Sequence, residues 1–510
     1  MISDRQTALI AETVPSTEPG ARRAGSEELG PLARAVAAEP VARAISPVVL
    51  AGCVRACEFL ALLALGIAIY SFYVYPGASP DWRYPAAVLA MSAAAVLVFQ
   101  AFDLYGIPTF RTHVYQLSRI GIAWSLVFLL AVALAFFTRS TGVFSRVWAA
   151  AWYVSGLGVL FAGRIALTAL VSHWARNGQL VRRVVIVGGG REGEALIQAL
   201  EAQANSDLRI CGVFDDRTGD RSPPVVAGVP KLGTVDDLVE FTRLTRVDLI
   251  LVSLPLTAED RVLQMVRKLW VLPVDIRLAA HMNRLRFRPR AYSYIGNVPV
   301  LDIFDKPIAD WNLVTKSVFD FVIASAALIA AAPVLALVAL AIKLDSPGPV
   351  FFRQRRYGFN NEVIGVLKFR SLYHHHADPN AKRVVTKDDP RVTRVGRFIR
   401  KTSIDELPQL INVLRGELSL VGPRPHAIEA PTANRLWDEV VDEYFARHRV
   451  KPGITGWAQV NGWRGELDTA EKLQRRVEHD LYYIENWSLL FDCYILLRTP
   501  FALLKAENAY

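Results

Sequence analysis

The stretch Val184-Val-Ile-Val-Gly-Gly-Gly-Arg-Glu-Gly193 places a soluble α/β unit in the middle of the chain. Its β-branched residues predict a buried strand, and its Gly-x-Gly-x-x-Gly loop opens a helical run over residues 194–202. Two more apolar runs, residues 210–214 and 248–254, predict further strands. This order of strand, glycine loop, helix and strand is typical of a Rossmann-like sheet, which we expect over residues 181–280.

The glycine loop also suits a nucleotide phosphate. Without a Cβ, Gly188, Gly190 and Gly193 let backbone amides approach a pyrophosphate at a helix N-terminus, and Asp215 or Asp216 would take the ribose hydroxyls. However, no Tyr-x-x-x-Lys pair occurs in the sequence to supply short-chain dehydrogenase chemistry. We therefore favour a structural or regulatory domain that keeps the glycines for strand–helix packing, with bound NAD(P) as the alternative.

Four apolar segments precede this unit, and each has close to the roughly 20 residues that cross a bilayer. They lie at residues 48–75, 85–102, 120–137 and 147–171. The cations that flank the set are Arg22, Arg23, Arg34 and Arg43 before it and Arg176, Arg182 and Arg183 after it. Both ends of a four-helix unit are thus predicted to be cytoplasmic, although Arg139 and Arg146 in the third connection count against this. A buried helical core is the alternative.

Composition agrees with a membrane protein of several parts. The chain has 510 residues, enough for roughly three units, and 52% of them are hydrophobic. Its net charge of +10 suits anionic lipid headgroups and phosphate substrates, while no nucleic-acid motif is present. The cysteines form no Cys-x-x-Cys pair, which argues against a zinc ribbon or a disulfide framework. Residues 1–46 lack apolar periodicity and a signal-peptide pattern, so we expect a disordered cytoplasmic tail.

A fifth apolar segment, residues 318–344, carries Pro333 near its middle. Proline removes a backbone donor and restricts Ala332 before it, so we expect the helix to break there. The flanking cations are Arg284, Arg286, Arg288, Arg290, Lys306 and Lys316 before the segment and Lys343, Arg353, Arg355 and Arg356 after it. Because both flanks are basic, we predict a re-entrant helix over residues 316–344 that enters one leaflet and returns. A kinked spanning helix is the alternative.

The stretch Arg400-Lys-Thr-Ser-Ile-Asp-Glu-Leu-Pro-Gln-Leu410 sets an adjacent carboxylate pair behind two cations. A carboxylate can attack phosphorus and hold the product as an acyl phosphate, and its neighbour can ligate a hard divalent cation. Most such pairs are only solvated charge on a helix. Close to a membrane segment, Asp405 and Glu406 instead favour phosphoryl transfer, with Mg²⁺ at the pair.

Several short motifs follow the fifth apolar segment in order. They are Ser346-Pro-Gly-Pro349, Gln354-Arg-Arg-Tyr-Gly358, Lys368-Phe-Arg-Ser371, Asp389-Pro-Arg391, Ser403-Ile-Asp-Glu-Leu-Pro408, Val421-Gly-Pro-Arg-Pro425 and Lys451-Pro-Gly-Ile-Thr-Gly-Trp-Ala-Gln459. With them, residues 311–510 resemble the bacterial polyprenyl-phosphate sugar-1-phosphate transferases, the monotopic phosphoglycosyl transferase superfamily. Asn461-Gly-Trp-Arg-Gly-Glu466 is most similar to the undecaprenyl-phosphate glucose phosphotransferases of exopolysaccharide and colanic acid assembly. Where many members have Ser-Pro, this chain has Ala332-Pro333, so the break rests on the proline alone.

The resemblance implies a multidomain membrane protein of the superfamily's long form. The expected parts are a tail at 1–46, a four-helix transmembrane unit at 47–175, a Rossmann-like α/β domain at 181–280, a linker at 281–310 and a mainly α catalytic domain at 311–510. The catalytic domain includes the re-entrant helix 316–344. The resemblance also implies the inner membrane of a bacterium, with the catalytic domain on the cytoplasmic side.

The resemblance assigns roles to individual residues. Asp405 is implied as the nucleophile and Glu406 as its partner near Mg²⁺. Two groups of further residues are implied to bind substrate: Arg400, Arg424, Lys368 and Arg370 at the phosphates, and Gly453, Thr455, Gly456 and Gln459 in a loop on the nucleotide side. The glycines of this last loop are equally compatible with a simple turn.

The implied reaction moves glucose 1-phosphate from UDP-glucose to undecaprenyl phosphate, releases UMP through a covalent aspartyl-phosphosugar intermediate and initiates exopolysaccharide synthesis. Transfer of galactose 1-phosphate or an N-acetylhexosamine 1-phosphate is the alternative within the class. A dinucleotide-dependent sugar-nucleotide oxidoreductase and a non-catalytic scaffold are the alternatives outside it. The expected partners are a UDP-sugar, undecaprenyl phosphate and the bilayer, without nucleic acid. The sequence leaves open a homodimer, the sugar, any ligand of the Rossmann-like domain and the polysaccharide made.

Overall fold

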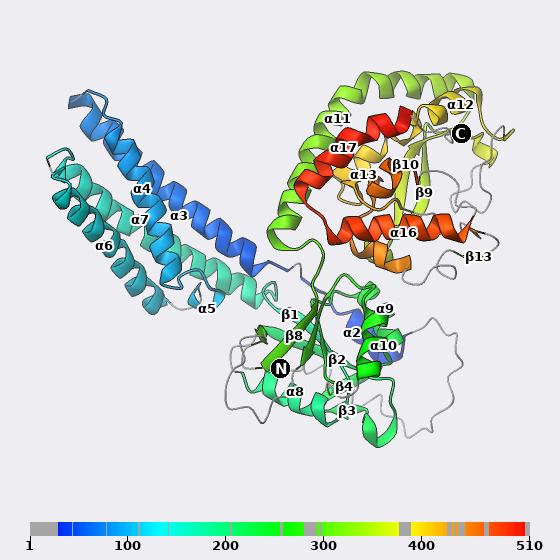
Figure 1. Cartoon of the computed structure of the whole chain (residues 1–510), viewed down its shortest axis with the longest axis horizontal. Coiled ribbons are helices and arrows are strands. Elements are labelled where there is room, and N and C mark those ends of the chain that lie inside the picture. The colour runs from blue at the N-terminus through cyan, green and yellow to red at the C-terminus, as the bar shows by residue number, and fades with distance from the viewer. Residues whose placement is uncertain are drawn as a thin grey trace. The chain divides into compact units, whose positions relative to one another are not determined.

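The computed structural model forms two units, Pro40–Val181 and a second that combines Met1–Glu39 with Arg182–Tyr510 (Figure 1). The residues that the structure describes are 29–42, 44–77, 79–110, 113–140, 142–203, 207–254, 259–279, 293–295, 298–376, 389–425, 431–432, 435–436, 444–463 and 469–504. Within these ranges, five helices are long and apolar enough to cross a membrane. Four belong to the first unit and one to the second.

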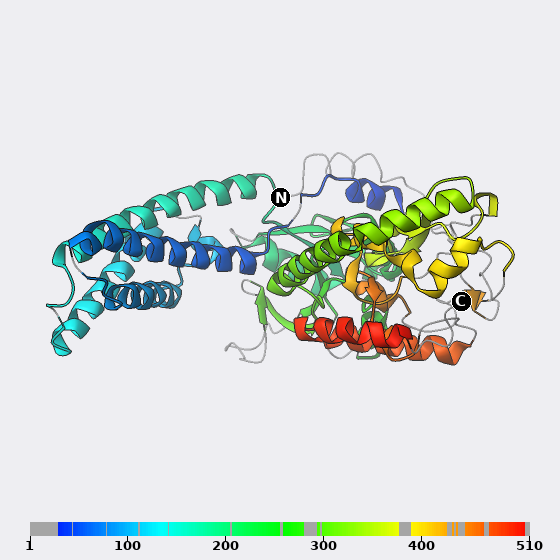
Figure 2. The same ribbon diagram turned by 90° about the horizontal axis from the view of Figure 1, so that it is seen from above.

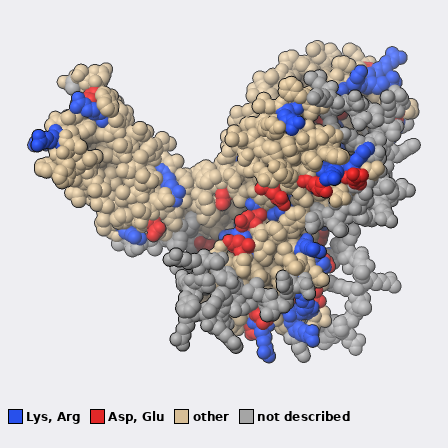
Figure 3. Space-filling model, in the orientation of Figure 1, with Lys and Arg blue, Asp and Glu red and all other residues tan. Residues whose placement is uncertain are grey.

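Long apolar helices make up the first unit. They are α3 (Pro47–Ile69), α4 (Arg83–Ala101), α6 (His113–Phe137) and α7 (Arg146–Arg176), with a short α5 (Ile107–Phe110) and the turns η1 (Tyr70–Val74) and η2 (Tyr75–Gly77) between them. Ser46 and Ser145 begin α3 and α7 by accepting hydrogen bonds from backbone amides three residues on. Each apolar segment predicted before the α/β unit is therefore helical, and the visible face of this unit is largely uncharged (Figure 3).

The helices of this unit pack closely through indole rings that lie against glycines. A Cβ on Gly66 would lie 2.8 Å from the Trp152 ring, and one on Gly156 would lie 2.8 Å from the Trp124 ring. Trp152 donates its ring N–H to the Leu62 carbonyl at 3.1 Å. Small residues thus let backbones approach while the indole hydrogen bonds stay internal, as packing in an apolar solvent requires.

A buried ion pair joins two helices of this unit. Arg164 on α7, 1% exposed, donates to both carboxylate oxygens of Glu58 on α3, at 2.7 and 3.1 Å. Its remaining terminal nitrogen donates to the Leu104 carbonyl at 2.7 Å, and Tyr105 donates to Glu58 at 2.9 Å. Each charge therefore has its counter-charge and its hydrogen bonds inside the unit.

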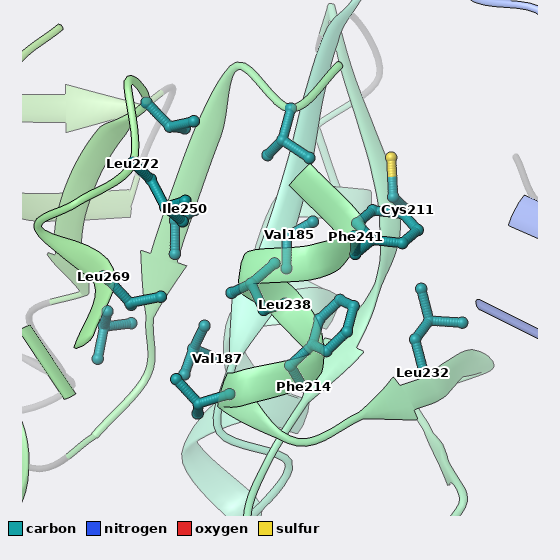
Figure 4. Close-up of a cluster of buried hydrophobic side chains, with 14 of the residues drawn as sticks. Val185, Val187, Cys211, Phe214, Leu232, Leu238, Phe241, Ile250, Leu269 and Leu272 are labelled. Atoms are coloured by element: carbon teal, nitrogen blue, oxygen red, sulfur yellow. The ribbon is translucent and has the colours of Figure 1, made fainter. Parts of the chain in front are cut away.

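The α/β domain has one sheet with strand order β3-β4-β2-β1-β5-β6-β8-β7. Its strands are β1 (Arg182–Val187), β2 (Leu208–Phe214), β3 (Val225–Val226), β4 (Val229–Gly233), β5 (Leu249–Val252), β6 (Asp275–Ala279), β7 (Ser293–Ile295) and β8 (Val298–Phe304), and its helices are α8 (Arg191–Glu201), η3 (Gly219–Arg221), α9 (Val235–Leu244) and α10 (Glu259–Leu269). From β4 to β6 neighbouring strands are parallel. Figure 4 shows Val185, Val187 and Phe214 of the sheet packed with Leu238 and Phe241 of α9. The predicted Rossmann-like sheet is confirmed.

Two predictions around this sheet are wrong. Within the predicted disordered tail, α2 (Pro31–Ala37) packs Ala33 and Val36 into the core beside α9 (Figure 1); residues 1–28 lie outside the described ones. Within the predicted linker 281–310, β7 and β8 extend the sheet, β8 pairing antiparallel with β6. Both elements are short and depend on burial against the domain, a tertiary effect that local sequence patterns do not carry.

The third part is the C-terminal domain, which follows β8. It contains α11 (Asp310–Asp345), β9 (Phe351–Tyr357), η4 (Phe359–Asn361), β10 (Val363–Phe369), η5 (His374–His376), α12 (Arg394–Lys401), η6 (Ile404–Glu406), α13 (Gln409–Leu414), β11 (Ser419–Val421), β12 (Pro431–Thr432), β13 (Arg435–Leu436), η7 (Tyr444–Arg449), β14 (Gly453–Thr455), α15 (Trp457–Val460), α16 (Ala470–Glu485) and α17 (Leu489–Leu504). β9 and β10 form an antiparallel hairpin, while β11 and β14 pair parallel. Figure 2 shows α16 and α17 running along one side of the domain, with α11 beginning next to α17 and running obliquely away from it.

α11 is one continuous helix that curves across the domain (Figure 1). Pro333 inside it removes a hydrogen bond, the ordinary cause of such a bend. The predicted break into two helices is therefore wrong. Both halves pack on the same domain: Lys316 reaches Asp492 of α17 at 2.7 Å, and Asp345 accepts from the backbone amide of Val395 on α12 at 3.1 Å. Between them, large apolar side chains such as Phe321, Ile329 and Leu337 are exposed.

Candidate active site

The predicted carboxylate pair lies on a single 3-10 turn between α12 and α13. Ser403, before the turn, has φ 57°, a left-handed conformation that a residue with a Cβ rarely adopts. Such backbone strain is typical of functional turns. The turn leaves Asp405 9% exposed and directs Glu406 toward the β9–β10 hairpin and the loop after β11. Two adjacent acids thereby acquire different surroundings.

Glu406 is held by two cations from different elements. Lys368 of β10 donates to its Oε1 at 3.0 Å, and Arg424 donates to Oε1 and Oε2 at 2.5 and 3.2 Å. Burial acts to raise the pKa of Glu406, but the charges and hydrogen bonds of Arg424 and Lys368 outweigh burial and hold that pKa well below its usual range. Glu406 is therefore an anion wherever the enzyme is folded near neutral pH.

Asp405 has the opposite character. Its carboxylate forms no hydrogen bond or ion pair with any described residue. Burial, joined by the negative charge of Glu406, raises the pKa of Asp405, although Lys368, Arg400 and Arg424 act to lower it. A more basic and unengaged carboxylate is the better nucleophile of the two.

A fourth cation at this site was not predicted. Arg356 of β9 donates to the Pro425 carbonyl and, at 2.8 Å, to Gln354. Burial, with the nearby charge of Arg424, lowers the pKa of Arg356 to about 9. The signal was in the sequence, since Arg356 lies in the quoted Gln354–Gly358 motif. The sequence analysis used Arg356 only as one of the basic flanks that predict the topology of the fifth apolar segment.

The structure does not bring Arg370 to the carboxylates. Its guanidinium donates at 2.6 and 2.7 Å to the carbonyls of Pro347 and Ser346, just beyond the end of α11. It also donates to the hydroxyl of Ser346 at 3.0 Å. These contacts fix the C-terminus of α11, where free carbonyls favour a cation. That Arg370 binds substrate phosphate stays a prediction.

The predicted nucleotide-side loop does reach the carboxylate turn. A cavity of about 210 Å³ is lined by Ser403, Glu406, Leu407, Leu410, Ile454, Thr455, Gln459, Val460, Thr499 and Ala502. The glycines nearby have a packing reason, because a Cβ on Gly456 would lie 2.3 Å from the Gly422 carbonyl oxygen and one on Gly453 would lie 2.1 Å from the Gly422 nitrogen. β14 therefore lies directly against the chain that leads to Arg424.

Of the two carboxylates, Asp405 is the one available to bind Mg²⁺. No group of three or more His, Cys, Asp or Glu side chains able to hold a metal occurs among the described residues. Glu406 is engaged by Arg424 and Lys368, whereas Asp405 forms no hydrogen bond or ion pair with another residue in the described ranges. Mg²⁺ in proteins is often held by one or two carboxylates, with water and substrate phosphates completing the octahedron. Asp405 suits that role, with Glu406 next to it.

In the α/β domain, the glycine loop is engaged by the domain itself. Gly188 has φ +108°, and a Cβ on Gly193 would lie 2.2 Å from the Gly188 carbonyl oxygen, so both glycines serve close packing. Gly189 donates its backbone N–H to Asp215 at 2.7 Å, and Arg217 binds the same carboxylate at 2.8 Å. These contacts agree with a structural role for the loop.

Comparison with known proteins assigns the family. A family model described as bacterial sugar transferase matches residues 311–506, and one described as CoA-binding domain matches residues 100–280. The chain belongs to the bacterial sugar transferase family, because relatives at 34% to 39% identity align with 70% or more of it. The resemblance inferred from the motifs is confirmed.

Three relatives carry closely related names. A UDP-glucose:undecaprenyl-phosphate glucose-1-phosphate transferase of Xanthomonas campestris pv. campestris is 34% identical over 89% of this chain and 94% of the relative. A relative of the same name from Escherichia coli (strain K12) is 36% identical over 76% of this chain and 81% of the relative. An undecaprenyl-phosphate glucose phosphotransferase of Komagataeibacter xylinus is 39% identical over 70% of this chain and 66% of the relative.

Proposed function

We propose that this protein transfers glucose 1-phosphate from UDP-glucose to undecaprenyl phosphate and releases UMP. Relatives that align along most of the chain carry this activity in their names. The observation that supports it most directly is the pair itself: a buried, unengaged Asp405 beside a Glu406 that is held ionised by Arg424 and Lys368. No dehydrogenase pair accompanies the glycine loop, so an oxidoreductase lacks support.

In the proposed first step, an oxygen of Asp405 attacks the phosphorus that bears the sugar. The bond from that phosphorus to the oxygen bridging it to the nucleotide breaks, and UMP leaves with the electron pair. In the second step an oxygen of the lipid phosphate attacks the same phosphorus, and Asp405 leaves as a carboxylate. Splitting one displacement between two anions into two steps lets a fixed group make the first attack.

The surrounding cations can stabilise the negative charge that the phosphates bring to the site in these steps. Lys368 and Arg424 lie beside the pair, where forked or compact positive groups stabilise phosphoryl oxygens. A Mg²⁺ ion held by Asp405 and the diphosphate oxygens would neutralise charge that otherwise repels an anionic nucleophile. Glu406 fixes Arg424 and Lys368 in place, so it orients donors rather than attacking.

The reaction is tested by UMP release from a panel of UDP-sugars, with and without undecaprenyl phosphate. UDP-glucose is expected to give the highest kcat/KM, and UDP-galactose and UDP-N-acetylhexosamines serve as competitors. In the absence of lipid phosphate, a single burst of UMP equal to the enzyme is expected, because Asp405 retains the phosphosugar. No UMP from any sugar would refute the proposal, and a preference for another sugar would reassign the substrate.

The bend of α11 supports a re-entrant helix with the transferase domain on the cytoplasmic side of the inner membrane. Its two halves pack on the same domain, and a straight helix of this length would extend about 54 Å, well beyond a bilayer core of about 30 Å. Cysteines placed at the exposed positions Asn312 and Lys343, in a chain without its native cysteines, are expected to be labelled only from the cytoplasm. Periplasmic labelling of either would indicate a spanning helix.

A further inference from the structure

Behind Arg424 the transferase domain gathers more positive than negative charge. Among the described residues, the groups that act on one another electrostatically are the cations Arg356, Lys368, Arg400, Arg424, Arg447 and Arg476 and the carboxylates Asp405, Glu406 and Asp480. In the described part of this domain, six cations thus face three carboxylates, most of them largely shielded from water. Buried charges in proteins are ordinarily paired, so a surplus of this kind requires a reason.

The available carboxylates are already committed. Glu406 binds Arg424 and Lys368, while Asp480 forms an ion pair with Arg447 at 2.7 Å. Arg447 also donates to the Arg424 carbonyl at 2.7 Å and to the Tyr444 hydroxyl at 2.8 Å, which makes it a support for the chain around Arg424. Asp405 remains unengaged because it is the reacting group.

Arg476 has no such partner. It lies on α16, one turn before Asp480, and is 4% exposed. Its side chain donates no hydrogen bond to any described residue, and its buried Nε is unpartnered. Burial, with the positive charge of Arg447, lowers the pKa of Arg476 to about 10, so the guanidinium is still charged at neutral pH. Within the part of the chain that the structure describes, this buried guanidinium has no acceptor for its Nε.

We propose that Arg476 is a further substrate-binding residue, which together with Arg424 and Arg356 receives a phosphoryl group. A phosphate oxyanion offers the paired acceptors that a guanidinium fork requires and the negative charge that this cluster lacks. Both the diphosphate of a nucleotide sugar and the phosphate of a polyprenyl lipid have this chemistry. The inference rests on the proposed function only in naming these two sources, because the site itself is defined by the unpartnered Nε of Arg476 and by the surplus of positive charge among the described residues.

The test compares Arg476→Met with Arg475→Met in the full-length protein. Methionine keeps the side-chain length and burial while removing the charge. Arg475 is an exposed neighbour on the same helix, and it forms an ion pair with Glu478. Thermal unfolding is measured alone and with added UMP, pyrophosphate or a short-chain polyprenyl phosphate, and KM and kcat are measured for both substrates. Arg476→Lys, which keeps the charge without the fork, is the third variant.

Without ligand, Arg476→Met is expected to unfold at the wild-type temperature or above, because it removes an unpaired buried charge. Its ligand-induced stabilisation is expected to fall, and KM for one substrate to rise roughly tenfold or more, with a partial recovery in Arg476→Lys. The substrate whose KM rises identifies the phosphate. Arg475→Met is expected to match wild type throughout.

Two results would overturn the inference. One is an Arg476→Met variant that loses stability without ligand yet keeps wild-type KM values and ligand-induced stabilisation, since Arg476 would then be a structural residue. The other is an equal loss in Arg475→Met. If wild type releases no UMP from any UDP-sugar, the proposed function fails, while the binding of UMP and pyrophosphate still decides the role of Arg476.

Discussion

Two buried arginines in this molecule show what separates a structural charge from a functional one. Arg164, in the apolar helical unit, has a carboxylate and a carbonyl for its donors within its own unit. Arg476, in the transferase domain, is buried to a similar degree, yet it has no hydrogen-bond acceptor among the described residues. Burial alone therefore does not identify a structural residue. The satisfaction of its hydrogen bonds does, because an unsatisfied buried donor is costly unless a ligand completes it.

The largest effect is expected at the reacting carboxylate, whose charge serves chemistry rather than folding. Asp405→Asn keeps the side-chain shape but provides a poor nucleophile, so UMP release should fall by at least about a thousandfold. The unfolding temperature should stay at or above that of wild type, since Asp405 makes no hydrogen bond in the described structure. Retention of more than about a tenth of the activity, in protein free of deamidated enzyme, would mean that another group attacks.

At Glu58 in the helical unit, a substitution is expected to lower stability and leave activity unchanged. Glu58→Ala would leave Arg164 buried without a counter-charge, which should cost about 3 kcal/mol or more of stability. The unfolding temperature in detergent measures this loss, while UMP release per folded molecule should be unchanged. The double variant Glu58→Met with Arg164→Met is the control and should recover much of the stability. If Glu58→Ala and wild type are equally stable, the ion pair of Arg164 does not stabilise the fold, and Arg164 is not a structural charge.

A smaller effect is expected on folding stability at acid pH, where Asp405 and Glu406 should change the stability in opposite directions. Folding lowers the pKa of Glu406 from its ordinary 4.5, so this group adds stability above pH 4.5 that is lost as the pH falls toward its folded value. Folding raises the pKa of Asp405 from 3.8, so the stability that Asp405 contributes falls as the pH rises through 3.8.

Unfolding temperatures measured from about pH 6 down to pH 3 would show this difference. Glu406→Gln should flatten the acid loss of stability, and Asp405→Asn should steepen it. Identical profiles for wild type and both variants would show that the cations of the cluster do not hold Glu406 ionised.

The smallest effect is expected at Arg400, which acts on the pair through its charge. Arg400 lowers the pKa of Asp405, so Arg400→Gln should raise that pKa and move the acid limb of the kcat/KM profile to higher pH. At pH 8, kcat should change by less than about threefold if this is its main effect. Arg397→Gln, an exposed neighbour on α12, is the control. An acid limb that does not move would leave Arg400 as a direct phosphate contact.

The sequence predicted those features that repeat or lie close together along the chain. The strand and glycine loop around Gly188 predicted the Rossmann-like sheet, and the lengths of the apolar segments predicted the long helices. The ordered motifs led to Asp405, Glu406, Lys368 and Arg424, which the fold brings together. Arg370 lies outside this group, because its donors bind carbonyls at the end of α11, a contact that a motif does not show. Arg476 could not be found, because its lack of acceptors is a property of three-dimensional packing.

The curvature of α11 has a consequence for the membranes in which this enzyme can work. A helix that crosses the bilayer must match its thickness, and mismatch is relieved by tilting or by deforming the lipid. Residues near the two ends of α11, Lys316 and Asp345, pack on one domain. In the proposed re-entrant arrangement, the helix would meet only one leaflet. The height of Asp405 above the headgroups would then be set by the protein, and the catalytic domain would tolerate thick and thin bilayers alike.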